Sequence, residues 1–176
     1  MSTAPPIGAD AVVPPRGGRL AARLRLAWLR ARARGALEAG RDVHVARGAR
    51  VRVARGRVRL GEGCLLGPGC RVEAAGGSIA IGAGARLGER SVIVALSAVT
   101  VGAGATVGEW AVLSDAEPSG ADVELPVRLQ PLRPAPIEVG AGARIGAHAA
   151  LAAGARLAPG EALGSYAVVP TPPSPA

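Results

Sequence analysis

Aliphatic residues recur along most of this chain in a regular pattern that also includes glycine. Motifs of the form aliphatic-x-aliphatic-Gly-x-Gly begin at Val58, Ile79, Val99 and Ile137. The first three are 21 and 20 residues apart, whereas the fourth begins 38 residues after the third. Similarity at a fixed period is typical of repeat architectures. The pattern therefore predicts one repeated structural unit, interrupted once by an insertion.

Inside each unit, an aliphatic residue recurs every six positions. Four residues after it, the side chain is small in twelve of fourteen cases. Neither the period of an amphipathic helix nor the alternation of a hairpin gives this spacing. It favours a short strand followed by a tight corner, with the aliphatic side chain inward and Gly at strained corner positions. The inward positions are predicted to be Leu60, Leu66, Val72, Ile81, Leu87, Ile93, Val101, Val107, Leu113, Val139, Ile145, Leu151, Leu157 and Leu163.

Three such units close one coil of a triangular solenoid. We therefore predict an all-β fold, a single-stranded parallel β-helix over residues 43–170 with about five coils. Ile81, Val101 and Val139 should lie on one face of it.

Three segments carry a resemblance to a known family: "IGAGARLGERSVI", "VGAGATVGEWAVL" and "VGAGARIGAHAAL". They resemble the hexapeptide-repeat acyltransferases, and the similarity covers about residues 43–170. The resemblance implies a left-handed β-helix and a homotrimer. It also implies an O-acyltransferase of polysaccharide biosynthesis, which transfers an acetyl group from acetyl-CoA to a hydroxyl of a sugar or glycan precursor.

The repeats stop over residues 114–136, where "SDAEPSGADVELPVRLQPLRPAP" intervenes. A long loop inside a solenoid is usually functional, so we expect this loop to project from the β-helix. The resemblance implies that it leans over a groove between subunits and carries a His that acts as general base. Ala116 stands where that His is expected. The candidate catalytic residues are therefore Asp115, Glu117 and His148, the last of these in the turn after the loop.

The binding site for coenzyme A follows from the resemblance alone. It implies a channel formed by backbone groups of Gly146, Ala147, Gly164 and Ser165. No metal is expected, because a zinc site with three His ligands cannot be built from a chain with two His.

The N-terminal part of the chain is strongly basic. Residues 1–60 hold 14 Arg against three acids, although the whole chain has a net charge of +8. Residues 1–18 are rich in Pro and Gly and are expected to be flexible, and residues 171–176 form a Pro-rich tail. Residues 19–40 are predicted to form a basic helix that ends at Gly40. Its apolar residues at helical spacing are Leu20, Leu24, Ala27, Trp28 and Ala31.

Three roles are open for this helix. It could cap the end of the solenoid, or it could contact an anionic membrane surface through its basic and apolar residues. Nucleic-acid binding is the least favoured, because stacking aromatic residues and a recognisable module are missing from the sequence, so no nucleic-acid partner is predicted.

Cys64 and Cys70 fall on the small-residue position of successive units, which favours buried free thiols in a reducing compartment. No apolar run is long enough to span a bilayer. We therefore expect a cytoplasmic protein, with peripheral contact to the inner face of the membrane as an option.

Two functions from different classes remain open. The first is acetyl-CoA-dependent O-acyl transfer with a displaced or substituted base. The second is a catalytically inactive hexapeptide-repeat protein, which serves as a trimeric scaffold or as the partner of an active paralogue.

Overall fold

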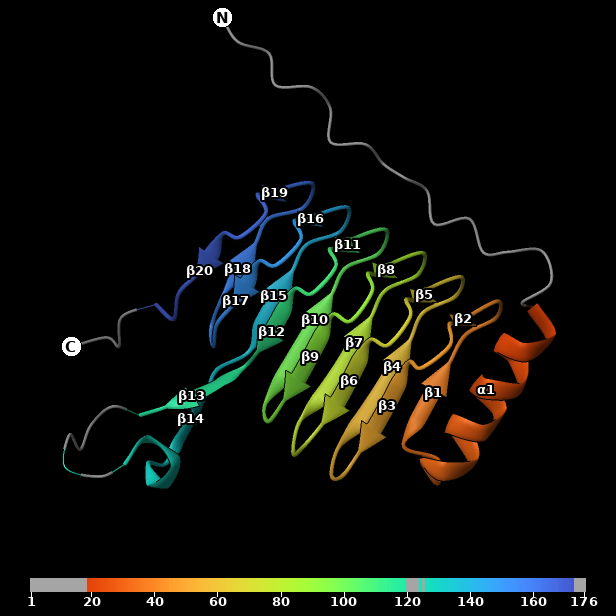
Figure 1. The fold of residues 1–176 in the computed structure, drawn as a ribbon, viewed down its shortest axis with the longest axis horizontal. Helices are drawn as coiled ribbons and strands as arrows, with labels where there is room; N and C mark the ends of the chain where they lie inside the picture. The colour runs from red at the N-terminus through yellow and green to blue at the C-terminus, as the bar shows by residue number, and fades with distance from the viewer. Residues whose placement is uncertain (1–18, 120–123, 125, 173–176) are drawn as a thin grey trace, which may run out of the picture.

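The chain winds into a solenoid whose three sides are parallel β-sheets (Figure 1). The computed structural model describes residues 19–119, 124 and 126–172. The predictions for residues 1–18, and for all but the first two residues of the tail at 171–176, lie outside the described residues.

Each sheet takes one strand from every coil, and each strand holds only two to four residues. Sheet A consists of β1 (Leu37–Ala39), β4 (Arg57–Leu60), β7 (Ser78–Ile81), β10 (Ala98–Val101), β15 (Ile137–Val139) and β18 (Arg156–Leu157). Sheet B consists of β2 (His44–Val45), β5 (Leu65–Leu66), β8 (Arg86–Leu87), β11 (Thr106–Val107), β16 (Arg144–Ile145) and β19 (Ala162–Leu163). Sheet C consists of β3 (Arg50–Val53), β6 (Arg71–Ala74), β9 (Val92–Ala95), β12 (Val112–Ser114), β17 (Ala150–Leu151) and β20 (Val168–Val169). The described chain thus makes six coils, one more than the expected five.

The register of the strands follows the aliphatic repeat. Val101 pairs with Ile81 on one side and with Val139 on the other, so the three lie on one face as predicted. Of the fourteen aliphatic positions, thirteen are buried, and Leu163 on the last coil is half-buried and packs against the core. The predicted hexapeptide-repeat solenoid is confirmed, and its parallel coils are consistent with a left-handed β-helix.

The small residues of the repeat fit inside the corners. Cys64 and Cys70 are fully buried and form no disulfide. Burial raises the pKa of the Cys64 thiol to about 11. The pKa of the Cys70 thiol is raised to about 12, mainly by burial and to a lesser extent by the charge of the nearby Cys64. Both thiols are therefore protonated and inert at neutral pH, as expected for structural cysteines.

Glycine is required at the corners because successive coils touch there. A Cβ added to Gly102 would lie 2.4 Å from the backbone nitrogen of Ala141 in the next coil. Gly104, two residues later, has a φ of +66° but open space around it. We expect Gly102→Ala to lower the free energy of unfolding by more than about 2 kcal/mol, because the backbones must separate. Gly104→Ala should cost only about 1 kcal/mol of backbone strain.

Urea unfolding of the two variants measures this difference. An equal loss in both would mean that neighbouring coils do not approach as closely at Gly102 as the structure has them.

The N-terminal helix covers one end of the solenoid (Figure 1). Helix α1 (Arg19–Arg32) buries Ala22, Leu26 and Leu29 against the first coil. It ends at Arg32 rather than at the expected Gly40, because Arg34 and Gly35 take positive φ values and turn the chain. The residues after this turn enter β1, so the β-helix begins at residue 37 and not at residue 43.

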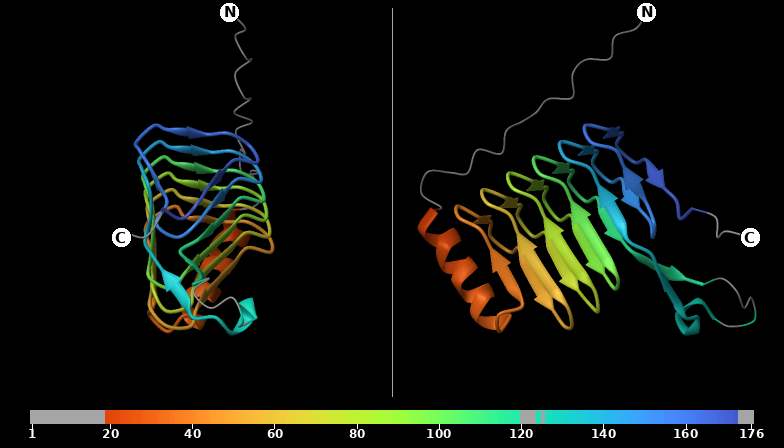
Figure 2. Two further views of the ribbon diagram at one scale, coloured as in Figure 1. Left: turned by 90° about the vertical axis from the view of Figure 1, so that its left-hand side faces the viewer. Right: turned by 180° about the vertical axis from the view of Figure 1, so that it is seen from behind.

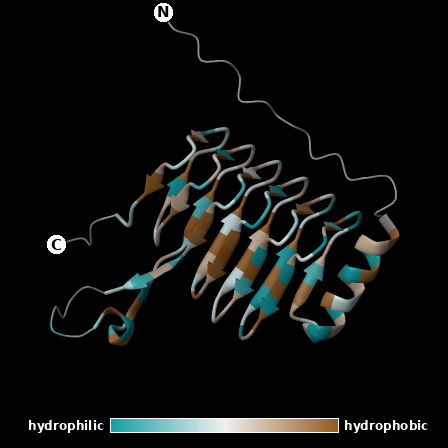
Figure 3. Cartoon of the chain, viewed as in Figure 1, coloured by the Kyte–Doolittle hydropathy of each residue, from teal (hydrophilic) through white to brown (hydrophobic). Residues whose placement is uncertain are grey.

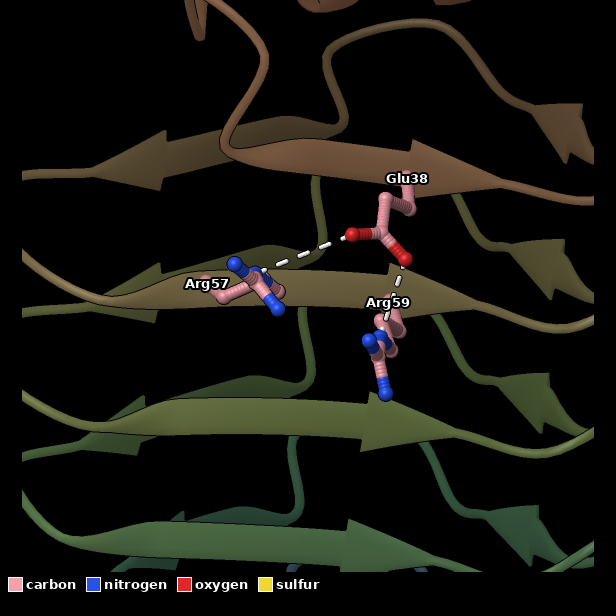
Figure 4. A network of polar contacts seen from close by, with 3 residues as sticks. All are labelled: Glu38, Arg57 and Arg59. Atoms are coloured by element: carbon pink, nitrogen blue, oxygen red, sulfur yellow. Dashed lines mark hydrogen bonds and ion pairs between the residues drawn. The ribbon is translucent and has the colours of Figure 1, made fainter.

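The first two coils are joined on their outer surface by a small charged network (Figure 4). Glu38 of β1 contacts Arg57 at 3.7 Å and Arg59 at 2.9 Å, both on the adjacent strand β4. All three side chains are more than half exposed, so these ion pairs add at most about 1 kcal/mol in total stability. Both ion pairs use Glu38, which is one of the few acidic residues in this part of the chain.

The insertion predicted at residues 114–136 holds a hairpin. Strand β13 (Ala116–Pro118) pairs antiparallel with β14 (Leu132–Pro134), and a short 3-10 helix η1 (Val127–Leu129) lies between them. The right-hand view of Figure 2 shows that this hairpin extends away from the coils. Because β10 and β15 on either side of it are neighbours in sheet A, the insertion leaves the stacking of coils intact.

The described part of the chain contains no helix that is both long enough and apolar enough to cross a membrane.

Candidate active site at one corner of the solenoid

The turn between sheets B and C contains one residue with a positive φ in every coil. In the first two coils this residue is glycine, but in the last four it has a large side chain with a φ of 52° to 60°. These positions are Gly48, Gly69, Arg90, Trp110, His148 and Tyr166.

The turn between sheets A and B has the same backbone geometry but uses different residues. After Asp42 in the first coil, all five equivalent positions are glycine: Gly63, Gly84, Gly104, Gly142 and Gly160. A residue other than glycine in this conformation costs roughly 1–2 kcal/mol. The chain accepts this strain four times at one corner and only once, at Asp42, at the other, and such strain often marks a functional site.

The four large residues stack along the corner. The guanidinium of Arg90 lies 4.8 Å from the centroid of the Trp110 ring. The ring of His148 lies 6.2 Å from that of Trp110 and 4.9 Å from that of Tyr166, with interplanar angles of 4° and 1°. We call these four residues the stacked column. Stacking contributes about 0.5–1.5 kcal/mol per aromatic pair, which offsets part of the backbone strain.

The stacked column fixes the imidazole of His148 while leaving it accessible. Trp110 and Tyr166 cover its two faces, and the residue itself is exposed. The ring nitrogens lie in the plane of the ring, so the covered faces do not block them. The backbone N–H of His148 also donates to the carbonyl of Glu109 in the preceding coil, which holds the turn in place. An oriented and accessible imidazole can accept and return a proton.

The other histidine lies in a different setting. His44 is half-buried on β2 in the first coil, next to α1. Burial, and then the charge of Arg25, lower its pKa. His44 thus lies in the first coil, at the basic end of the solenoid, whereas His148 lies in the fifth coil.

The residues predicted for coenzyme A lie at the same corner as His148. Gly146 and Ala147 directly precede it, and Gly164 and Ser165 occupy the equivalent positions of the last coil. A Cβ on Gly146 would lie 2.4 Å from the nitrogen of Ser165, so these two turns are in direct contact. The carbonyl of Ala147 accepts from the N–H of Tyr166.

Asp115 has a different environment from the one expected for a catalytic acid. Its side chain is fully buried, and its two carboxylate oxygens accept the backbone N–H groups of Leu96 and Ser97, each at 2.7 Å. Its own carbonyl accepts from Ala135 at the return of the hairpin. With both oxygens occupied, this geometry favours a structural acceptor that joins the hairpin to the preceding coil.

Glu117 and Ala116 lie on β13, at the base of the hairpin. Both are half-buried, and Ala116 is opposite Pro134 on β14. The hydroxyl of Thr171 donates to Glu117 at 2.5 Å, which ties the C-terminal segment to the hairpin. Ala116 offers no group that can transfer a proton.

Within one chain, these predicted residues fall at two different corners. His148 stacks on Trp110, which precedes Asp115 by five residues, and strand β12 lies between the two. Extended chain covers about 3.3 Å per residue, so Trp110 and Asp115 lie at opposite ends of this strand and at most roughly 16 Å apart. The structure thus groups His148 with the four residues predicted for coenzyme A, and it places Asp115, Ala116 and Glu117 at the far end of sheet C.

Three members of the stacked column, Arg90, Trp110 and Tyr166, were not predicted from the sequence. The signal was available in the spacing, because these residues occupy the same place in the repeat as His148. It was also available in the composition, because Trp110 and Tyr166 are two of only three Trp, Tyr and Phe residues in the chain.

Among the described residues, no group of three or more His, Cys, Asp or Glu side chains is placed to hold a metal ion.

Comparisons with known proteins identify no family. No protein-family model and no curated protein matches the chain. Among solved structures, the chain is similar to a mutant of AntD, an N-acyltransferase from Bacillus cereus, in complex with dTDP-4-amino-4,6-dideoxyglucose and coenzyme A. The two share 11% identity over 77% of this chain and 79% of that chain, with a TM-score of 0.46. At this identity and TM-score, the similarity supports no conclusion about this chain. The fold is therefore inferred from the strand pairing of the chain itself, and its function from the geometry of the site.

Proposed function

We propose that the protein is an acyl-CoA-dependent acyltransferase that moves an acetyl group from acetyl-CoA to a hydroxyl of a sugar or glycan precursor. The observation that carries this proposal is the stacked column. It holds an accessible imidazole at a strained corner, beside the turns predicted to bind coenzyme A. The resemblance of the repeats to hexapeptide-repeat acyltransferases supports the reaction class.

The reaction needs one proton to move twice. His148 accepts the proton of the acceptor hydroxyl as its oxygen attacks the thioester carbonyl, which gives a tetrahedral intermediate. The carbon–sulfur bond then breaks, and the imidazolium returns the proton to the thiolate of coenzyme A. A base positioned in this way typically contributes 10²–10⁴-fold to the rate.

The remaining candidates fit this role less well. Both oxygens of Asp115 are bound to backbone N–H groups, and Glu117 accepts the hydroxyl of Thr171. Within the described part of the chain, the ring nitrogens of His148 make no hydrogen bond, and His148 is the more exposed of the two histidines.

A homotrimer would complete the site. The hairpin exposes Val127, Leu129 and Leu132, and it extends away from its own coils. The corner and sheet C of the last three coils expose a second apolar patch, formed by Trp110, Val112, Tyr166 and Val168. Exposed apolar patches of this kind usually mark contact surfaces. In our proposal, the hairpin of one copy covers this patch on the next copy and brings Glu117 towards its His148.

We expect light scattering during size-exclusion chromatography to give about three times the 17.4 kDa of one chain. Substituting Leu129→Ser and Leu132→Ser should shift the protein towards smaller assemblies, because the apolar contact is lost. A wild-type monomer at all concentrations would contradict the trimer and the shared groove.

The release of coenzyme A thiol from acetyl-CoA, measured with sugar acceptors, tests the function. In this assay Ala116→His should change the rate by less than about tenfold, because His148 already supplies the base. A gain of about 10²–10⁴-fold would instead identify residue 116 as the position of a missing base. If neither protein turns over with any acceptor, the inactive scaffold remains as the second candidate, favoured by the alanine at 116.

A further inference from the structure

Helix α1 has two apolar sides, and only one of them packs on the solenoid. Ala22, Leu26 and Leu29 are buried against the first coil. The residues at the other apolar side are exposed, including Leu20 at 72%, Leu24 at 66% and Trp28 at 59%. The apolar residues predicted from the sequence thus face outward, and a different set forms the cap. Figure 3 shows that hydrophobic and hydrophilic residues alternate along this helix.

The exposed apolar residues form a continuous stripe. At 3.6 residues per turn, Leu20, Leu24, Ala27, Trp28 and Ala31 fall within about 100° of arc and along roughly 16 Å of the helix. We call them the outer stripe of α1. α1 lies at the end of the solenoid (Figure 1). Because its opposite side is buried against the first coil, the outer stripe faces away from the coils.

Arginines lie on both sides of the outer stripe. Arg23 and Arg30 fall on one side of it on the helical wheel, and Arg25 and Arg32 on the other. Arg25 and Arg30 donate to backbone carbonyls of the first coil, those of Val45 and Ala39, which leaves Arg23 and Arg32 as the flanking arginines without such a bond among the described residues. Arg32 also lies over the ring of Trp28, at 5.3 Å from its centroid. The helix contains no acid, and Glu38 in the first coil is already paired with Arg57 and Arg59.

A cleft between α1 and the first coil adds to this basic end. It has a volume of about 910 Å³, and its lining includes Arg23, Arg30, Arg41 and His44, with Asp42 as its one acid. Three guanidinium groups around one cleft are suited to anionic phosphate groups.

We propose that the outer stripe of α1 docks on a bilayer that contains anionic phospholipids. The apolar side chains enter the interface, and Arg23 and Arg32 on either side of the stripe contact the phosphates. The helix therefore has two roles at once, as cap and as anchor. A second copy fits the stripe less well, because it would bring together two helices with five arginines each and no acid.

The test is sedimentation of the full chain with vesicles of known composition. We expect the wild type to sediment with vesicles that contain phosphatidylglycerol, less so as salt is raised, and to remain in solution with pure phosphatidylcholine vesicles. Substituting Leu24→Ser and Trp28→Ser should lower the partition coefficient at least about tenfold, because two large apolar contacts are lost. The matched control, Leu24→Ile with Trp28→Phe, should bind like the wild type.

The charge contribution is tested separately. Substituting Arg23→Gln and Arg32→Gln should lower binding about 25-fold, since each arginine near an anionic surface contributes about fivefold. The control pair Arg86→Gln and Arg144→Gln, on sheet B away from α1, should change binding much less.

Three results would overturn the proposal. The first is equal sedimentation with both kinds of vesicle, and the second is no sedimentation at all. The third is a change of assembly size in the Leu24→Ser and Trp28→Ser variant, which would show that a second copy covers the stripe. Binding of duplex DNA without vesicle binding would assign nucleic acid as the partner instead. These variants lie far from His148, so acetyl transfer to a soluble acceptor should be unchanged, and a failure here leaves the proposed function intact.

Discussion

Substituting His148→Asn should lower kcat/KM for acetyl transfer by about 10²–10⁴-fold. Asparagine tolerates the positive φ of this corner better than most residues, so the turn should remain folded. It cannot, however, accept a proton from the acceptor hydroxyl. The KM for acetyl-CoA should change little, because the neighbouring Gly146 and Ala147 are intact. Steady-state kinetics of the two proteins measures this split.

Two further variants separate a chemical role of His148 from a structural one. Tyr166→Phe keeps the stacked ring and removes only a hydroxyl, so its rate should be close to that of the wild type. His148→Gly leaves a gap between Trp110 and Tyr166, and added imidazole should restore part of its lost rate. If His148→Asn retains full activity, or if imidazole restores nothing, His148 is not the base.

Substituting Asp115→Ala should lower the free energy of unfolding by about 3–5 kcal/mol. The change removes a fully buried carboxylate and leaves the N–H groups of Leu96 and Ser97 without their acceptors. A hydrogen bond to a charged group contributes about 1.5–3 kcal/mol, and a buried donor without a partner adds a desolvation cost. Urea unfolding monitored by circular dichroism measures this loss.

Two controls bracket the prediction for Asp115. Asp115→Asn keeps one acceptor oxygen and should lose about half as much stability as the alanine variant. Glu117→Gln, on the adjacent strand β13, should change stability by less than about 1 kcal/mol, because its contact with Thr171 is exposed. A loss of activity in Asp115→Asn without any loss of stability would restore the catalytic role that the sequence analysis assigned to Asp115.

The solenoid could be predicted from the sequence because its core is periodic. The six-residue spacing fixes which side chains point inward, and the pairing of Val101 with Ile81 and Val139 follows from that spacing alone. The 38-residue gap also predicted where the coils are interrupted. The insertion does not alter the stacking of the coils, so the repeats before and after it could be aligned correctly when residues 114–136 were left out.

The first strand, β1, was missed because its composition resembles that of the helix before it. Arg, Ala and Leu all favour helices, and the chain from residue 19 onwards is rich in them. The stop signal was Gly35, which adopts a φ of 87° directly after Arg34, and not the later Gly40. The strand Leu37–Ala39 forms because it can pair with β4, and such tertiary pairing overrides local propensity.

The candidate site could be predicted only in part. His148 was identified by its residue type, but its partners Trp110 and Tyr166 follow from stacking between coils, which requires the exact alignment of corners. The burial of Asp115 could not be seen either. Its acceptor role depends on two backbone N–H groups 18 and 19 residues earlier in the chain.

Calorimetric titration of the wild-type protein with acetyl-CoA measures directly whether the chain has a donor site for acyl-CoA. We predict saturable binding with about one site per chain and a Kd between about 1 μM and 1 mM, the usual range for enzyme substrates. Binding should weaken when Gly146→Val places a side chain against the turn that contains Ser165. An absence of saturable binding by a folded wild-type assembly would contradict the account and leave the protein as a scaffold without a donor site.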